Sequence, residues 1–111
     1  MIEFPEFMKS PANRIGKESQ FTEGIEGYVY NGADGCQMAF WTCYQDREST
    51  PHTHDFDEYL AVVHGQYALI IDGREQTMLA GQECHIPKGT PHAGRSLAGT
   101  RTIHCFGGKR V

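Results

Sequence analysis

Short apolar runs separated by glycine-centred turns make up most of the chain after about residue 27, and this pattern restricts the fold more than any other feature. No segment after residue 20 shows the 3.6-residue apolar period of an amphipathic helix. Glycine is abundant, with 13 among 111 residues, and β-branched and aromatic residues lie between the glycines. Many short strands at regular spacing indicate an antiparallel sandwich or barrel. We therefore predict an all-β fold.

The expected strands follow from the apolar runs and the turns that flank them. Asp72-Gly73 is a strong two-residue hairpin signal, and residues 87–91 form a rigid turn with prolines at both ends. Residues 31–35 form a turn of residues that tolerate positive φ, and residues 45–50 form a polar loop. The expected strands cover residues 27–30, 36–44, 52–54, 58–64, 66–71, 74–79, 81–86, 92–96 and 100–106.

A chain of 111 residues is expected to form one domain. Residues 1–26 are predicted to form an N-terminal arm with a short helical turn, and this arm is expected to pack on a barrel made by residues 27–111. The expected strand at 36–44 is apolar on both faces, so its outer face needs a cover. Either the arm or a second subunit meets that need.

The net charge of the chain and the length of its apolar stretches argue against nucleic-acid and membrane partners. The net charge of −4 argues against a nucleic-acid binder, and the apolar stretches are too short to span a bilayer. The first residues lack the basic and apolar regions of a signal peptide. We therefore expect a cytoplasmic protein with no nucleic-acid or membrane partner.

The four cysteines are scattered along the chain and form no CxxC pair. In a chain without a signal sequence we interpret them as reduced, mostly buried thiols. A zinc site built from them is the less favoured alternative. The four are Cys36, Cys43, Cys84 and Cys105.

All six histidines lie between positions 52 and 104, within the expected β region. Residues two apart in a strand share one face, so His52 and His54 would present both imidazoles to the same side. Glu58 has the same parity, and His92 follows the proline-glycine turn. Imidazole and carboxylate together suit divalent Mn, Fe, Co, Ni, Cu or Zn. Taken singly, the His-x-His pair and the glutamate are more often surface residues.

The order and spacing of these residues resemble the two motifs of the cupin superfamily. The first motif is His-x-His, three residues, Glu, six residues and Gly, and the second is Gly, five residues, Pro-x-Gly, two residues and His. Two positions depart from the pattern, because Asp46 and Ser96 replace a frequent glycine and asparagine. The matching positions are His52, His54, Glu58, Gly65, Gly81, Pro87, Gly89 and His92.

The resemblance implies an antiparallel jelly-roll β-barrel with a short N-terminal arm. It also implies one divalent transition metal (Fe, Mn, Ni, Zn, Co or Cu) held by a set of four ligands. Cupins are often dimers, and the apolar outer face of residues 36–44 agrees with that, so we predict a homodimer. The implied ligands are His52, His54, Glu58 and His92.

Four protein ligands on an octahedral metal leave two positions open for water, dioxygen or a chelating small molecule. An open position distinguishes a catalytic from a structural metal. We therefore expect a small metalloenzyme that acts on an oxygen-rich small molecule, as a dioxygenase or as an isomerase or lyase of a sugar or keto acid. The alternatives are a non-catalytic small-molecule-binding or sensor protein and a barrel that the metal merely stabilises.

The last expected strand lines the pocket in metal-dependent cupins. If its even positions face inward, Thr102, His104 and Phe106 point into the barrel. His104 is then the candidate catalytic residue, as a general acid or base, and the alternative is an interior histidine that only forms hydrogen bonds. For Trp41, core packing or a dimer contact is favoured over the alternative of lining the pocket. His64 and His85 are expected to be structural or surface residues.

Overall fold

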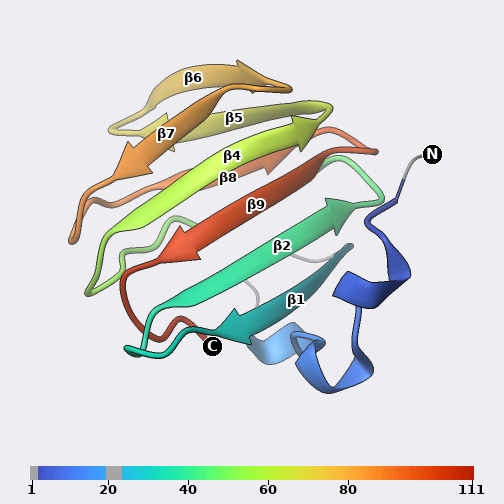
Figure 1. Cartoon of the computed structure of the whole chain (residues 1–111). Helices are drawn as coiled ribbons and strands as arrows, with labels where there is room; N and C mark the ends of the chain where they lie inside the picture. Colours follow the sequence, from blue (N-terminus) through green and yellow to red (C-terminus); the bar gives the residue numbers. More distant parts are fainter. Residues whose placement is uncertain (1–2, 20–23) are drawn as a thin grey trace.

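The computed structural model describes residues 3–19 and 24–111. The described residues form three short 3-10 helices and nine strands (Figure 1). No helix among them is long and apolar enough to cross a membrane. The elements are η1 (Glu6–Met8), η2 (Pro11–Asn13), η3 (Lys17–Ser19), β1 (Ile25–Asn31), β2 (Gln37–Cys43), β3 (Arg47–Glu48), β4 (Glu58–His64), β5 (Gln66–Ile71), β6 (Arg74–Leu79), β7 (Glu83–Ile86), β8 (Ala93–Ser96) and β9 (Arg101–Phe106).

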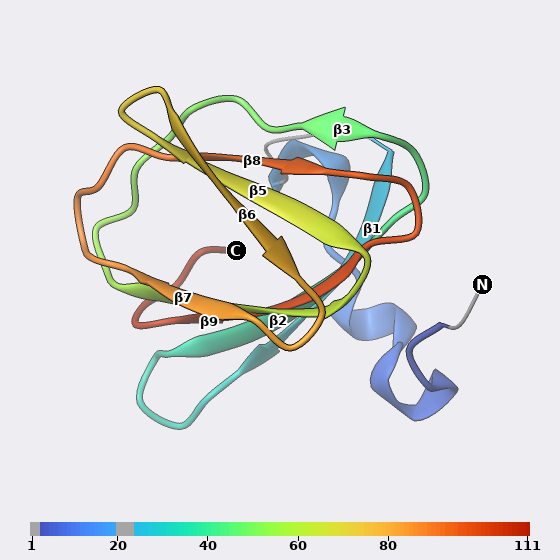
Figure 2. The same cartoon turned by 90° about the horizontal axis from the view of Figure 1, so that it is seen from above.

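Two antiparallel sheets face each other, as Figure 2 shows from above. One sheet has the strand order β1-β2-β9-β4-β7, and the other has the order β3-β8-β5-β6. Most neighbours within a sheet are far apart in the sequence, as in a jelly roll. The predicted all-β antiparallel jelly-roll fold is confirmed. Within the described residues the two sheets remain separate, so hydrogen bonds do not close them into one continuous barrel.

The hairpin of β5 and β6 has the predicted bounds. Its two turn residues, Asp72 and Gly73, have φ of 51° and 74°, which is the backbone of a type I′ turn. By contrast, the predicted strand at residues 52–54 is wrong, because only His52 forms an isolated bridge there. Pro51 has no N–H to donate to a strand ladder. The predicted polar loop contains β3, which pairs with β8.

Apolar side chains fill the space among β4, β5, β6 and β7. Burying each large side chain of this kind stabilises the fold by about 1.5–3 kcal/mol. A second apolar cluster lies between β2, β9 and the N-terminal residues and includes Ile15, Ala39, Trp41 and Phe106. The polar site described below lies beside this second cluster. The first cluster consists of Leu60, Val62, Leu69, Met78 and Ile86.

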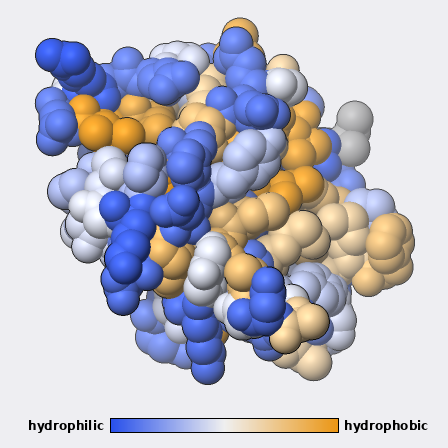
Figure 3. Space-filling model, turned by 60° about the vertical axis from the view of Figure 1, so that its left-hand side comes forward, coloured by the Kyte–Doolittle hydropathy of each residue, from blue (hydrophilic) through white to orange (hydrophobic). Residues whose placement is uncertain are grey.

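The N-terminal residues cover part of the outer face of β2. The Phe4 ring lies 4.8 Å from that of Phe40, centroid to centroid, and Phe40 is only 1% exposed. Met38, on the same strand, is 41% exposed. A space-filling view shows apolar residues gathered on one face between hydrophilic borders (Figure 3). The homodimer stays a prediction.

The four cysteines are all free thiols. The prediction that they are mostly buried is wrong, because only Cys43 is buried. Cys105 is exposed, since it occupies an outward position of β9 between two inward residues. Burial raises the pKa of the Cys84 thiol to about 11, so this thiol is protonated near neutral pH.

Candidate metal centre

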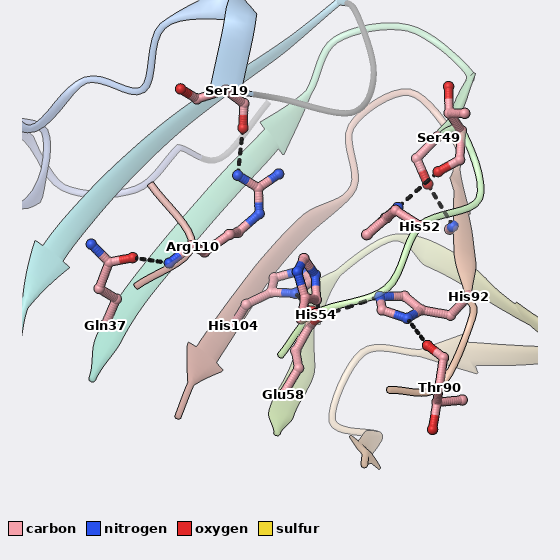
Figure 4. Close-up of polar contacts among 12 residues, drawn as sticks. Ser19, Gln37, Ser49, His52, His54, Glu58, Thr90, His92, His104 and Arg110 are labelled. Carbon is pink, nitrogen blue, oxygen red and sulfur yellow. Dashed lines mark hydrogen bonds and ion pairs between the residues drawn. The ribbon is translucent and has the colours of Figure 1, made fainter. Parts of the chain in front are cut away.

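Three imidazoles converge in the space between the two sheets. One ring nitrogen each from His52, His54 and His92 lies within 4.8 Å of the others. The ring centroids of His52 and His92 are 4.4 Å apart, and those of His52 and His54 are 4.9 Å apart. Figure 4 shows the residues around this cluster. The group contains no cysteine, so among the described residues the alternative cysteine zinc site has no support.

Backbone hydrogen bonds bring the two histidine-bearing segments together. The N–H groups of His52 and His92 each donate to the other residue's carbonyl at 2.9 Å. The N–H of Gly89 donates to the carbonyl of His54 at 3.0 Å. Gly89 has φ of +78°, which glycine adopts without strain. The Pro-x-Gly turn therefore holds the first histidine pair against the segment that carries the third histidine.

Backbone carbonyls orient two of the rings. The Nδ1 atom of His52 lies 2.7 Å from the Thr50 carbonyl, and that of His92 lies 2.8 Å from the Thr90 carbonyl. When Nδ1–H donates to these carbonyls, Nε2 keeps its lone pair, as in histidines that bind metals. Burial lowers the pKa of His52 to about 4, so this ring is neutral near pH 7. A neutral ring is the form that binds a metal.

Glu58, the first residue of β4, places a carboxylate among the imidazoles and is only 5% exposed. Its Oε1 atom lies 3.3 Å from His54 Nε2 and 3.4 Å from His92 Nε2, but has no hydrogen-bond partner. Burial alone would raise the pKa of Glu58, yet the hydrogen bond from His104 and the nearby imidazoles of His54 and His92 hold it well below the ordinary value. A buried anionic oxygen without a hydrogen bond, beside ring nitrogens, fits a cation bound between them.

His104 lies against Glu58 and is 7% exposed. Its Nδ1 is 2.7 Å from Glu58 Oε2, and its Nε2 is 3.0 Å from Thr102 Oγ1. Thr102, His104 and Phe106 all line the cavity, which agrees with the predicted inward parity. Because both ring nitrogens of His104 are engaged, the geometry favours a residue that positions the Glu58 carboxylate over a free acid or base.

Replacing His104 with phenylalanine is expected to weaken metal binding about 10–100-fold, the usual effect of losing a hydrogen-bond partner of a metal ligand. Competition with a chromophoric chelator measures this affinity. His104→Gln keeps an N–H donor for Glu58 and should restore part of it, while His64→Gln, outside the cluster, should change nothing. Full affinity in His104→Phe would contradict the positioning role.

The cluster forms part of the wall of a cavity of about 670 Å³, open mouth included. Trp41 lines it, with its ring edge-on to His104 at a centroid distance of 4.8 Å. Trp41 also belongs to the second apolar cluster, so the favoured core placement is confirmed, and the same side chain lines the cavity as well. Sequence reasoning missed Tyr67 and Arg110, which line the same cavity and carry no local motif.

The two remaining histidines lie outside this cluster. His64 and His85 are both exposed. The Nδ1 of His64 lies 3.1 Å from the Gly99 carbonyl, and the Nε2 of His85 lies 3.0 Å from Asp57 Oδ2. Both have the surface or structural placement that the sequence predicts.

Comparison with known proteins shows a family and a shared fold. Residues 40–107 match the sequence model of the family described as cupin domain, and no curated protein matches the chain. KdgF from Halomonas sp. aligns with a TM-score of 0.68 and 21% identity, over 75% of this chain and 77% of that one. An RmlC-like cupin from Shewanella frigidimarina aligns with a TM-score of 0.68 and 18% identity, over 85% of this chain and 92% of that one. The polyketide cyclase RemF from Streptomyces resistomycificus aligns with a TM-score of 0.66 and 20% identity, over 78% of this chain and 66% of that one.

Proposed function

The chain belongs to the cupin domain family, and on this basis we propose that it is a small metalloenzyme acting on an oxygen-rich small molecule. Its metal would be one divalent transition-metal ion held by His52, His54, Glu58 and His92. The observation that carries this proposal is the buried Oε1 of Glu58, which lacks a hydrogen bond yet lies 3.3 and 3.4 Å from the ring nitrogens of His54 and His92.

A metal bound there would supply Lewis-acid or redox chemistry. The chain's own residues supply the surroundings. His104 holds the Glu58 carboxylate, and the rings of Trp41 and Phe106 form an apolar wall. Burial raises the pKa of Tyr67 well above its ordinary value, so its hydroxyl stays protonated and can donate a hydrogen bond to an oxygen of the ligand. These residues would orient a polar molecule and exclude water from it.

Two reaction classes fit this site, a dioxygenase and an isomerase or lyase of a sugar or keto acid. RemF, described as a polyketide cyclase, supports the view that this fold accommodates enzymes, but its 20% identity carries no substrate to this chain. The alternative is a non-catalytic small-molecule-binding or sensor protein, which would use the same cavity.

Elemental analysis of the purified chain, before and after reloading with each candidate metal, tests the proposal. We expect about one ion per chain. Iron with ligand-dependent oxygen uptake would indicate a dioxygenase, and turnover with Mn, Ni or Zn in the absence of oxygen would indicate an isomerase or lyase. Tight small-molecule binding without turnover would favour the sensor. A chain that binds no metal after reloading would overturn the proposal.

A further inference from the structure

The cavity has a charge opposite to that of the whole chain. The net charge of the chain is −4, yet two arginines, Arg47 and Arg110, line the cavity. Among the residues that the structure describes, Glu58 is the only carboxylate residue lining it, and the imidazoles already surround that carboxylate. A divalent metal would add further positive charge. A positively charged cavity in an acidic protein attracts anions selectively.

The Arg110 guanidinium is fixed against the apolar wall of this cavity. It lies 5.4 Å from the centroid of the Trp41 ring and 5.9 Å from that of Phe106, and its Nη1 donates to the Ser19 carbonyl. The Trp41 ring in turn contacts the edge of His104. Figure 4 shows Arg110 on the β2 side of the cluster, near His104. The guanidinium therefore lies beside the proposed metal centre rather than on the outer surface.

A buried amide holds the segment that carries Arg110. Gln37, at the start of β2, is 4% exposed. Its Oε1 accepts hydrogen bonds from the N–H groups of Arg110 at 2.7 Å and Val111 at 3.0 Å. Its Nε2 donates to the Val111 carbonyl at 3.0 Å. One side chain thus makes three hydrogen bonds to residues more than 70 positions away.

Glycines complete the turn that leads from β9 to this segment. The Gly107 N–H donates to the Asp57 carbonyl at 2.8 Å. A Cβ at Gly108 would lie 2.7 Å from the Phe56 ring, so a larger residue would displace the chain. These contacts, together with the hydrogen bonds of Gln37, hold residues 107–111 across the cavity.

We propose that Arg110, positioned by Gln37, binds the carboxylate of an anionic substrate, a small hydroxy- or keto-carboxylate, at the metal centre. This inference rests on the proposed function and narrows its substrate class. A guanidinium matches a carboxylate through two parallel hydrogen bonds. A singly charged carboxylate matches the single charge of one guanidinium, whereas a phosphate carries two charges. The Tyr67 hydroxyl can donate to a second oxygen of the same molecule.

Calorimetry with the metal-loaded chain tests this inference with three small probes that share a carbon chain: glycerate, glycerol and glycerol phosphate. We expect glycerate to bind at least about 10-fold more tightly than glycerol, the lower bound for a charge-assisted contact. Arg110→Gln should weaken glycerate binding about 10–100-fold and leave both metal content and glycerol binding unchanged. Arg74→Gln, at an exposed position of β6, is the matched control and should bind like the wild type.

Gln37 has its own readout, the ratio of glycerate to glycerol affinity. Gln37→Leu should lower this ratio about 10-fold at unchanged metal content, whereas Gln37→Glu keeps the accepting oxygen and should lower it less. An equal affinity of the wild type for glycerate and glycerol would overturn the inference even if the variants fail to fold. So would tighter binding of glycerol phosphate than of glycerate, or wild-type glycerate affinity in Arg110→Gln.

The two proposals fail in different ways. A chain that binds metal but shows no role for Arg110 overturns the carboxylate site and leaves the metal centre standing. A chain that binds no metal, yet binds glycerate through Arg110, overturns the proposed metalloenzyme and supports the anion site.

Discussion

Replacing His52 and His54 together with alanine is expected to reduce bound metal from about one ion per chain to an undetectable level. The two substitutions remove half of the proposed ligands, and the remaining Glu58 and His92 cannot hold a divalent ion against its hydration. The ring nitrogens of His52, His54 and His92 all lie within 4.8 Å of one another, so they would act on one ion. Elemental analysis after metal reloading and gel filtration gives the stoichiometry.

The chain offers a matched control for this double variant. His64 and His85 are exposed and lie outside the cluster, so His64→Ala/His85→Ala removes two histidines and should retain the full metal content. Circular dichroism would show that both double variants keep the β-sheet fold. Equal metal content in the two double variants would mean that the cluster is not the metal site.

Replacing Glu58 with glutamine is expected to lower metal affinity more than about 100-fold, since losing an outer-shell partner alone costs 10–100-fold. The amide keeps the shape of the side chain but supplies no negative charge to balance the ion. It also removes the charge from the 2.7 Å contact with His104 Nδ1. Chelator competition measures the affinity. Glu83→Gln, at an exposed position of β7, should bind metal like the wild type.

The same substitution has a pH-dependent effect on the metal-free protein. Imidazole contacts hold the pKa of Glu58 below its ordinary value of 4.5, so the carboxylate stabilises the fold above pH 4.5. This stabilisation is lost as the pH falls from 4.5 through the lower folded pKa. The difference in free energy of unfolding between wild type and Glu58→Gln should therefore be larger at pH 7 than at pH 3. A constant difference in urea unfolding would contradict the coupling between Glu58 and the imidazoles.

Strand positions were predictable where local chemistry alone determines them. The alternation of apolar residues and the Asp72-Gly73 turn give the bounds of β5 and β6, because a type I′ turn fixes the register of its hairpin. The prediction failed at residues 52–54, where Pro51 interrupts the ladder. His52 and His54 still meet His92, but the backbone bridge between His52 and His92 brings them together, rather than one face of a strand.

The surroundings of the candidate site were less predictable, because they depend on contacts between distant segments. The alternation of side chains along the last strand predicted that His104 faces inward. Its contact with Glu58, however, depends on the pairing of β4 with β9. Nothing near Arg110 in the sequence indicates that Gln37, 73 positions away, holds it beside the cavity. The prediction for Trp41 was based on its own strand alone. An inward-facing side chain has the same sequence pattern whether it faces the apolar core or the cavity.

The proposed ligands are attached to both layers of the fold. Glu58 begins β4 in the five-stranded sheet, whereas His92 directly precedes β8 in the four-stranded sheet. An ion held by both residues would have to leave before the layers separate, so by mass action the unfolded population falls about tenfold for each tenfold rise in free metal above Kd. Unfolded chains are the ones that proteases degrade. The abundance of this protein in a cell would then follow the local metal supply.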